Sequence, residues 1–87
     1  MINPNTSQEI TDLVVSSAKR VASPGTEIVG ATGRFGARYI VSRAGAAVAA
    51  HAALDAYAAH SVGMDVVALS CFGDPGLQGL RELAQQP

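Results

Sequence analysis

The sequence has no tryptophan, few aromatic residues of other types and a single cysteine, and each of these scarcities limits the kind of domain that the chain can form. Two Phe and two Tyr are its only aromatic residues, and alanine, which buries little area per residue, makes up much of its apolar content. A chain of 87 residues forms one small domain and buries only about 60–65% of the surface that its unfolded form exposes. We therefore expect a marginal core that a partner surface or further chain completes.

Charge of one sign and long apolar runs are also scarce. The formal net charge of −1 produces no field that would favour nucleic acid or an anionic membrane as a partner. No apolar run approaches the roughly 20 residues that span a bilayer, and the N-terminus lacks a signal-peptide pattern. The lone Cys71 cannot form an internal disulfide, which is typical of a reducing compartment. We expect a cytoplasmic protein with no nucleic-acid or membrane partner.

Helical spacing is clearest after the first few residues. Apolar residues recur at helical intervals over 7–22, and basic residues in the last turn suit the helix dipole. Thr6 and Glu9 have the spacing of a capping box, with Ser7 as the alternative N-cap. The Pro24-Gly25 turn ends this predicted helix.

The rest of the chain alternates between strand and helix patterns. The predicted elements are a strand at 26–33, an alanine-rich helix at 42–60, a central apolar strand at 64–71 and a helix from 77 onward. This alternation predicts an α/β fold, a three-layer parallel sheet with flanking helices and right-handed crossovers. Only Met1 and Ile2 precede the first loop, whereas strands usually have about 5–6 residues, so the first strand looks clipped.

Three loops follow the predicted strands and should meet at one edge of the sheet. Ligands of open parallel sheets bind outside the carboxyl ends of the strands. The loops 3–7, 31–36 and 71–76 are rich in Gly, Pro, Asn and Ser/Thr, and two of them lead directly into helices. Exposed amides at helix N-termini attract anions, so we predict a small anionic ligand, most simply a carboxylate.

Several polar or reactive residues near these loops or on the neighbouring helix are candidates for a functional role. The Cys71 thiol beside helix N-termini would have a lowered pKa, or it fills space at a strand end. Arg34 could hold a carboxylate bidentately, or it belongs to a solvated rim with the neighbouring arginines. His51 and Asp55 stand four apart on one helix face, and we favour a surface pair over a metal site because no third ligand accompanies them. We expect Asp74 to cap the helix that follows it.

Two strings carry a family resemblance. "INPNTS" (2–7) and "CFGDPGL" (71–77), at this spacing, resemble the Asp/Glu/hydantoin racemase family, most closely its hydantoin racemase branch. The first string alone would be a modest signal, but together with the second the match is specific and spans most of the chain. By contrast, no Gly-x-Gly-x-x-Gly follows a strand, which disfavours nucleotide binding.

The resemblance implies one Rossmann-like lobe of a two-lobe racemase that works without a cofactor or metal. In such enzymes one thiolate removes the proton of a carbonyl-flanked carbon and an opposite thiol returns one to the other face. Cys71 matches the first catalytic cysteine. The resemblance places five residues at the substrate: Asn5, Thr6 and Ser7 in the first loop, and the backbone N–H groups of Phe72 and Gly73. Arg34 is a further candidate, because its guanidinium group could bind a carboxylate.

The second lobe of the family has no counterpart in this sequence. Residues 1–87 are expected to be a single α/β lobe, a truncated first half of a racemase that acts on a small carboxylate or hydantoin-like substrate. Because a second cysteine is absent, we expect the isolated chain to be incomplete as an enzyme and to associate with a second lobe or form a homo-oligomer. A non-catalytic module for binding small anions or for dimerisation is the alternative.

Overall fold

The amphipathic stretch near the N-terminus forms helix α1, Gln8–Val21, in a computed structural model that describes all 87 residues. The predicted helix 7–22 is confirmed to within one residue at each end. Its N-cap is Ser7, in extended backbone conformation, and no side chain caps the first turn. The capping box of Thr6 and Glu9 was therefore the wrong choice, and the alternative N-cap is correct.

The alanine-rich stretch forms α2, Arg43–His60, and the predicted helix 42–60 is confirmed. Ser42 is its N-cap, and the Ser42 hydroxyl accepts a hydrogen bond of 3.0 Å from the Gly45 N–H. The buried side of α2 consists of alanines alone: Ala49, Ala52, Ala53 and Ala56. Side chains this small let the helix backbone lie close to the strands beneath it, which is the packing that the composition predicted.

Helix α3, Leu77–Leu83, packs against α2 through a close backbone approach. Its N-cap Gly76 has φ +83°, and a Cβ there would lie 2.8 Å from the Ala50 carbonyl oxygen. The prediction that the Asp74 side chain caps this helix is wrong, since no side chain caps α3. Instead, the Asp74 carbonyl accepts a 3.1 Å hydrogen bond from the Leu77 N–H.

The sheet is smaller than predicted. Strands β1, Ile2–Asn3, and β2, Ala31–Thr32, pair in parallel. The run 64–71 is not a regular strand and contributes only an isolated parallel bridge between Leu69 and Ile2. Because β1 has only two residues, the apolar runs on either side of it have no partner over most of their length.

The central position of the sheet belongs to β1. Its neighbours are β2 on one side and Leu69 on the other. The prediction that 64–71 is a central strand covered on both faces is therefore wrong, and Val66 within it is 62% exposed.

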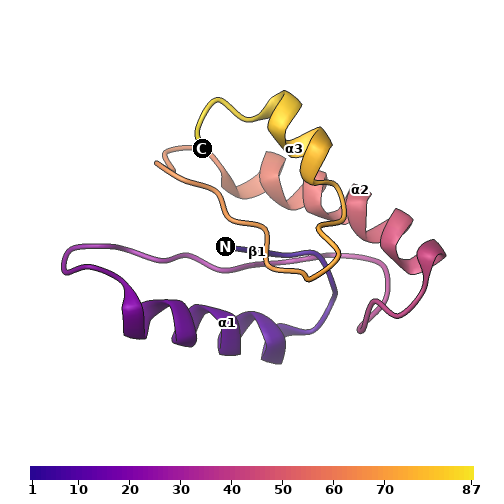
Figure 1. Cartoon of the computed structure of the whole chain (residues 1–87), viewed down its shortest axis with the longest axis horizontal. Coiled ribbons are helices and arrows are strands. Elements are labelled where there is room, and N and C mark those ends of the chain that lie inside the picture. Colours follow the sequence, from indigo (N-terminus) through magenta and orange to yellow (C-terminus); the bar gives the residue numbers. More distant parts are fainter.

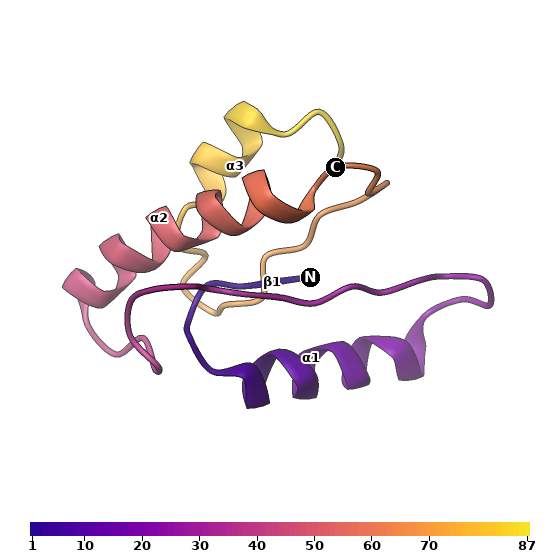
Figure 2. The same ribbon diagram turned by 180° about the vertical axis from the view of Figure 1, so that it is seen from behind.

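The helices lie on both sides of these paired segments. In the two opposite views, α1 lies on one side, and α2 and α3 lie on the other (Figures 1 and 2). A small core between the strands and α2 holds Ile2, Ala31, Ala53, Ala56 and Leu80. The α/β class is thus confirmed, with a two-stranded parallel sheet where a larger three-layer sheet was expected. None of the three helices has both the length and the apolar character needed to cross a bilayer.

The close contact at Gly76 generates a stability prediction. Gly76→Ala should lower the free energy of unfolding by about 1–3 kcal/mol, because the added Cβ collides with the Ala50 carbonyl and because alanine is strained at positive φ. Gly73→Ala is the matched control in the same loop, since a Cβ there meets nothing within 4 Å. Urea denaturation followed by circular dichroism measures both. Equal midpoints for the two variants would contradict the packing of α3 on α2 described above.

Candidate functional site

Asn3, the last residue of β1, organises the loop that follows it. Its side chain is 2% exposed, and its Nδ2 lies 2.8 Å from Asn5 Oδ1, 3.0 Å from Thr11 Oγ1 and 3.1 Å from the Ser7 carbonyl oxygen. Two amide hydrogens are thus shared among three acceptors. This single side chain ties the strand end, the loop and the first turns of α1 together.

Asn5 continues the network and keeps a free donor. Its Oδ1 accepts from the Ser7 N–H at 2.9 Å as well as from Asn3. Its own N–H lies 3.3 Å from Asn3 Oδ1. The Asn5 Nδ2 group has no hydrogen-bond partner within the chain, and the residue is half-buried. Asn5 can therefore hold the loop with its oxygen and offer its amide nitrogen to a ligand.

Ser7 carries the most unusual polar atom of the structure. The residue is 3% exposed, and its Oγ is a buried side-chain oxygen without any hydrogen-bond partner. Buried hydroxyls are nearly always hydrogen-bonded, because an unmade bond costs about 1–3 kcal/mol. The hydroxyl stands at the N-cap of α1, where the first N–H groups of the helix also lack intrahelical partners. This combination favours an anionic or carbonyl oxygen as the partner.

The second loop is fixed directly onto the first. The Gly33 N–H donates to the carbonyls of Asn3 and Asn5, at 2.8 and 3.0 Å. A Cβ at Gly33 would lie 2.8 Å from the Pro4 carbonyl oxygen, so only glycine fits there. The Thr6 N–H adds a bond of 3.1 Å to the Ala37 carbonyl.

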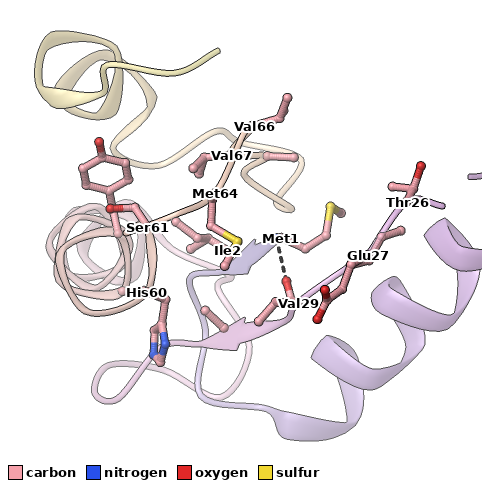
Figure 3. A pocket seen from close by; sticks show the side chains of 15 residues that line it. Met1, Ile2, Thr26, Glu27, Val29, His60, Ser61, Met64, Val66 and Val67 are labelled. Atoms are coloured by element: carbon pink, nitrogen blue, oxygen red, sulfur yellow. Dashed lines mark hydrogen bonds between the residues drawn. The ribbon is translucent and has the colours of Figure 1, made fainter.

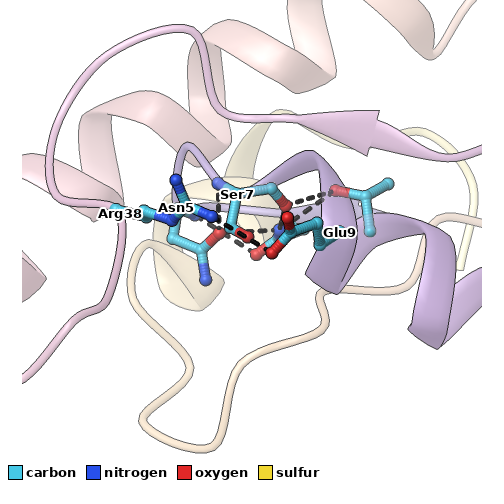
Figure 4. A network of polar contacts seen from close by, with 6 residues as sticks. Asn5, Ser7, Glu9 and Arg38 are labelled. Carbon is cyan, nitrogen blue, oxygen red and sulfur yellow. Dashed lines mark hydrogen bonds and ion pairs between the residues drawn. The ribbon is translucent and has the colours of Figure 1, made fainter.

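An ion pair joins the segment after the second loop to the first turn of α1. Arg38 contacts Glu9 at 3.1 Å, across the start of α1 (Figure 4). Both side chains are exposed, at 59% and 80%, so Arg38, one of the arginines that neighbour Arg34, lies in a solvated rim. Figure 4 shows Asn5, Ser7, Glu9 and Arg38 close together at this end of the helix.

Cys71 begins the third loop, beside β1. The Ser70 N–H donates to the Ile2 carbonyl at 2.7 Å, so the chain leaves the paired segment one residue before the thiol. Cys71 is a free, half-buried cysteine and is not sealed in the core. The neighbouring N–H groups of Phe72 and Gly73 have no hydrogen-bond partner in the chain, and both residues are exposed.

The topology places the first and third loops at the same end of the sheet. The chain runs from β1 to β2 on one side and later returns to pair on the opposite side of β1. Ligands of open parallel sheets bind at such a switch point, outside the carboxyl ends of the strands. Loops 3–7 and 71–76 both leave the sheet at that end. The structure therefore brings the predicted Asn5, Thr6 and Ser7 to the same edge as the Cys71 loop.

Arg34 is engaged elsewhere, with helix α2. Its Nε donates to Asp55 Oδ2 at 2.8 Å, and a second guanidinium nitrogen contacts Asp55 Oδ1. The hydrogen bond from Arg34 holds the pKa of the Asp55 carboxyl below its usual range, and Asp55 in turn raises the pKa of Arg34. In this arrangement the bidentate partner of Arg34 is a carboxylate of the chain itself.

His51 and Asp55 have different partners, although they share one helix face. The ring of His51 meets Phe35 edge-on, with centroids 5.0 Å apart, while Asp55 binds Arg34. The structure contains no group of three His, Cys, Asp or Glu side chains that could hold a metal ion. Both contacts attach the second loop to α2.

Sequence reasoning missed three residues that shape this site: Asn3, Thr11 and Gly33. Thr11 Oγ1 lies 2.6 Å from Thr32 Oγ1 and links α1 to the end of β2. An asparagine that ends a strand and a glycine that follows the next strand were visible signals, because both residue types allow close loop contacts. A mid-helix threonine carries no such signal.

The chain matches a known protein family along its whole length. The sequence model of the Asp/Glu/hydantoin racemase family matches residues 1–87, the whole chain. The chain belongs to this family. The resemblance predicted from the two short strings is thereby confirmed.

Curated and solved racemases resemble the chain over its full length. It is 32% identical over 89 residues to the hydantoin racemase of Paenarthrobacter aurescens and 30% identical over 88 residues to that of Pseudomonas sp. (strain NS671). The allantoin racemase from Klebsiella pneumoniae matches 99% of the chain with a TM-score of 0.92 and 42% identity. The chain spans 38%, 35% and 36% of the length of these three racemases, respectively.

The Arg34–Asp55 pair generates a prediction about protonation. Because the folded pKa of Asp55 is lowered, the stabilisation from this pair should be complete above the ordinary carboxyl pKa of about 3.9 and be lost as the pH falls through the lowered value. Arg34→Met should raise the Asp55 pKa toward its ordinary value, as measured by carboxyl ¹³C NMR. Arg38→Met, which removes the pair with Glu9, is the control and should leave the Asp55 pKa unchanged. An unchanged Asp55 pKa in Arg34→Met would contradict the assigned pairing.

Proposed function

We propose that this racemase-family chain acts as the first lobe of a cofactor-independent racemase, with Cys71 as the base for one face of the substrate. The observation that carries the proposal is the buried, unpartnered Ser7 hydroxyl at the N-terminus of α1. It stands on the loop that leaves the sheet next to the Cys71 loop, at the switch point of the topology.

The reaction would begin with the Cys71 thiolate. Its sulfur takes the proton from a carbon next to a carbonyl group, and the electron pair of the broken C–H bond moves into that carbonyl. The product is an enolate, whose negative charge rests on oxygen, and a neutral thiol. Phe72 and Gly73 would stabilise that oxygen with their unpartnered N–H groups, as an oxyanion hole does.

The first loop would hold the substrate during this step. The Ser7 hydroxyl and the Asn5 Nδ2 group are donors without partners in the chain, and Thr6 lies between them. Hydrogen bonds from these groups to a second oxygen of the substrate would orient the C–H bond toward sulfur. Arg34 would assist only if it left Asp55, so we assign it to positioning the second loop.

The relatives suggest the substrate class. Two are hydantoin racemases and one is an allantoin racemase, and both of these substrates are ring ureides with a C–H group next to a carbonyl. We therefore favour a hydantoin-type ring over an open-chain amino acid.

Inversion needs a second acid on the opposite face of the substrate. Cys71 is the only thiol of the chain, so a second lobe or a partner would supply that acid. Phe72, directly after the thiol, is fully exposed, at 108% of its reference area. An aromatic ring this exposed beside the site is suited to be covered by that second lobe.

A proton-exchange experiment tests the proposal on this chain alone. One enantiomer of a 5-substituted hydantoin is incubated in D₂O with the protein, and loss of the C5 proton is followed by NMR above the buffer rate. Because only one thiol is present, exchange should occur with retention of configuration. Cys71→Ala should reduce the protein-dependent rate by about 10²–10⁴-fold, to background.

The control is Gln78→Ala, a substitution at an exposed position of α3. This variant should catalyse exchange of the hydantoin C5 proton at the same rate as the unaltered protein. Exchange that persists in Cys71→Ala would overturn the role of the thiol. Binding of the hydantoin without any exchange in the unaltered protein would identify the non-catalytic binding module instead.

A further inference from the structure

The three loops at the carboxyl ends of the paired segments are held by contacts that close into a ring. Strand β1 leads directly into the first loop, 3–7. The Gly33 N–H of the second loop donates to the carbonyls of Asn3 and Asn5 in the first loop. On the other side of β1, the chain pairs once more and then enters the third loop, 71–76. The first loop is thus attached to the second, and β1 connects the first loop to the third.

Helix α2 closes this ring, because the second and third loops both pack against it. The second loop reaches α2 through the ion pair of Arg34 with Asp55. It makes a second contact where the ring of Phe35 meets His51 edge-on. The third loop reaches α2 at Gly76, where a Cβ would lie 2.8 Å from a carbonyl oxygen of the helix. The contacts therefore run from β1 through the first and second loops to α2, and back through the third loop.

The link between Arg34 and Asp55 is the only ion pair in this ring. Their side chains are 67% and 20% exposed, and two guanidinium nitrogens contact both carboxylate oxygens. An exposed ion pair adds little to global stability, but a bidentate pair fixes the relative orientation of the two groups. This pair is therefore suited to hold one loop in one orientation.

We propose that Arg34 and Asp55 are positioning residues for the proton transfer, a role that rests on the proposed function. Their pair holds the second loop on α2, and the second loop holds the loop that carries Asn5 and Ser7. The Cys71 loop is attached to the same helix. A closed ring leaves none of the three loops free to move alone, so the substrate donors and the sulfur keep a fixed relation. Proton transfer depends on such a relation, since a displacement of about 1 Å costs up to about 100-fold in rate.

The opposite end of the sheet supplies a reference amide for testing this role. An apolar cavity of about 210 Å³ lies there beside Met1, and neither Arg34 nor Asp55 lines it (Figure 3). The Ile2 N–H at this cavity donates to the Ala68 carbonyl at 2.7 Å. Exchange of this amide should not respond to a loosened ring, but it would accelerate if the whole fold lost stability.

Amide hydrogen exchange in Asp55→Ala tests the hold of the ion pair on the second loop. The Gly33 amide should exchange about tenfold faster or more than in the unaltered protein. The amides of Ile2 and Leu80 should change little, because they are bonded at the cavity and at the start of α3, respectively. Arg43→Met is the control: it removes an exposed arginine of α2 that has no ion-pair partner, and it should leave Gly33 exchange unchanged.

Exchange of the hydantoin C5 proton then tests the positioning role. Asp55→Ala should lower the rate at saturating hydantoin by about tenfold, while the half-saturating concentration changes little. The rate at which iodoacetamide alkylates Cys71 should also change little, because the thiol itself keeps its surroundings. Arg34→Met should give the same loss, and the double variant should lose no more, because each change removes the same pair. Arg43→Met should keep the unaltered rate.

Three results would overturn the inference. The first is unchanged Gly33 exchange in Asp55→Ala. The second is equal acceleration of the Gly33, Ile2 and Leu80 amides, which would identify a contribution to global stability instead. The third is an unaltered rate at saturating hydantoin although the Gly33 amide exchanges faster. A lack of hydantoin exchange in the unaltered protein would overturn the proposed function and the positioning role with it, whereas Gly33 exchange would still report whether the pair holds the second loop.

Discussion

The side-chain amide of Asn3 is the interaction on which the rest of the site depends. It is buried at the end of β1 and bonds to the following loop and to α1. A buried amide left without partners would be costly, so the loop adopts the conformation that satisfies it. That conformation places the Ser7 hydroxyl and the Asn5 amide nitrogen at the edge of the sheet, where Cys71 also arrives. Asn3 touches no ligand in this account, but it positions the groups that would.

The helices and the family could be predicted from local patterns. Helix α1 follows from apolar spacing, and α2 from a run of alanines behind the N-cap Ser42. These signals are local, since each lies within a few residues of the element that it specifies. The two strings at 2–7 and 71–77 were specific enough to indicate the racemase family, which the comparison of residues 1–87 confirms.

Features that depend on distant partners could not be predicted. The apolar patterns at 26–33 and 64–71 predict strands, but they carry no information about the segment with which each would pair. Both segments pair with β1, which has two residues, so each forms only a short stretch of regular pairing. Arg34 was a candidate for the substrate because sequence shows its charge but not Asp55, 21 residues away. The unpartnered state of the Ser7 hydroxyl likewise emerges only when the surrounding atoms are in place.

Exchange of the Ser7 amide in Asn3→Ala tests the central role of Asn3 most directly. The Ser7 N–H donates to Asn5 Oδ1, which Asn3 holds in place. The Ser7 amide is expected to exchange about tenfold faster or more in the variant, while the amides within α2 keep their protection. Unchanged Ser7 exchange in a folded Asn3→Ala protein would contradict it, because the loop would then hold its shape without the buried amide.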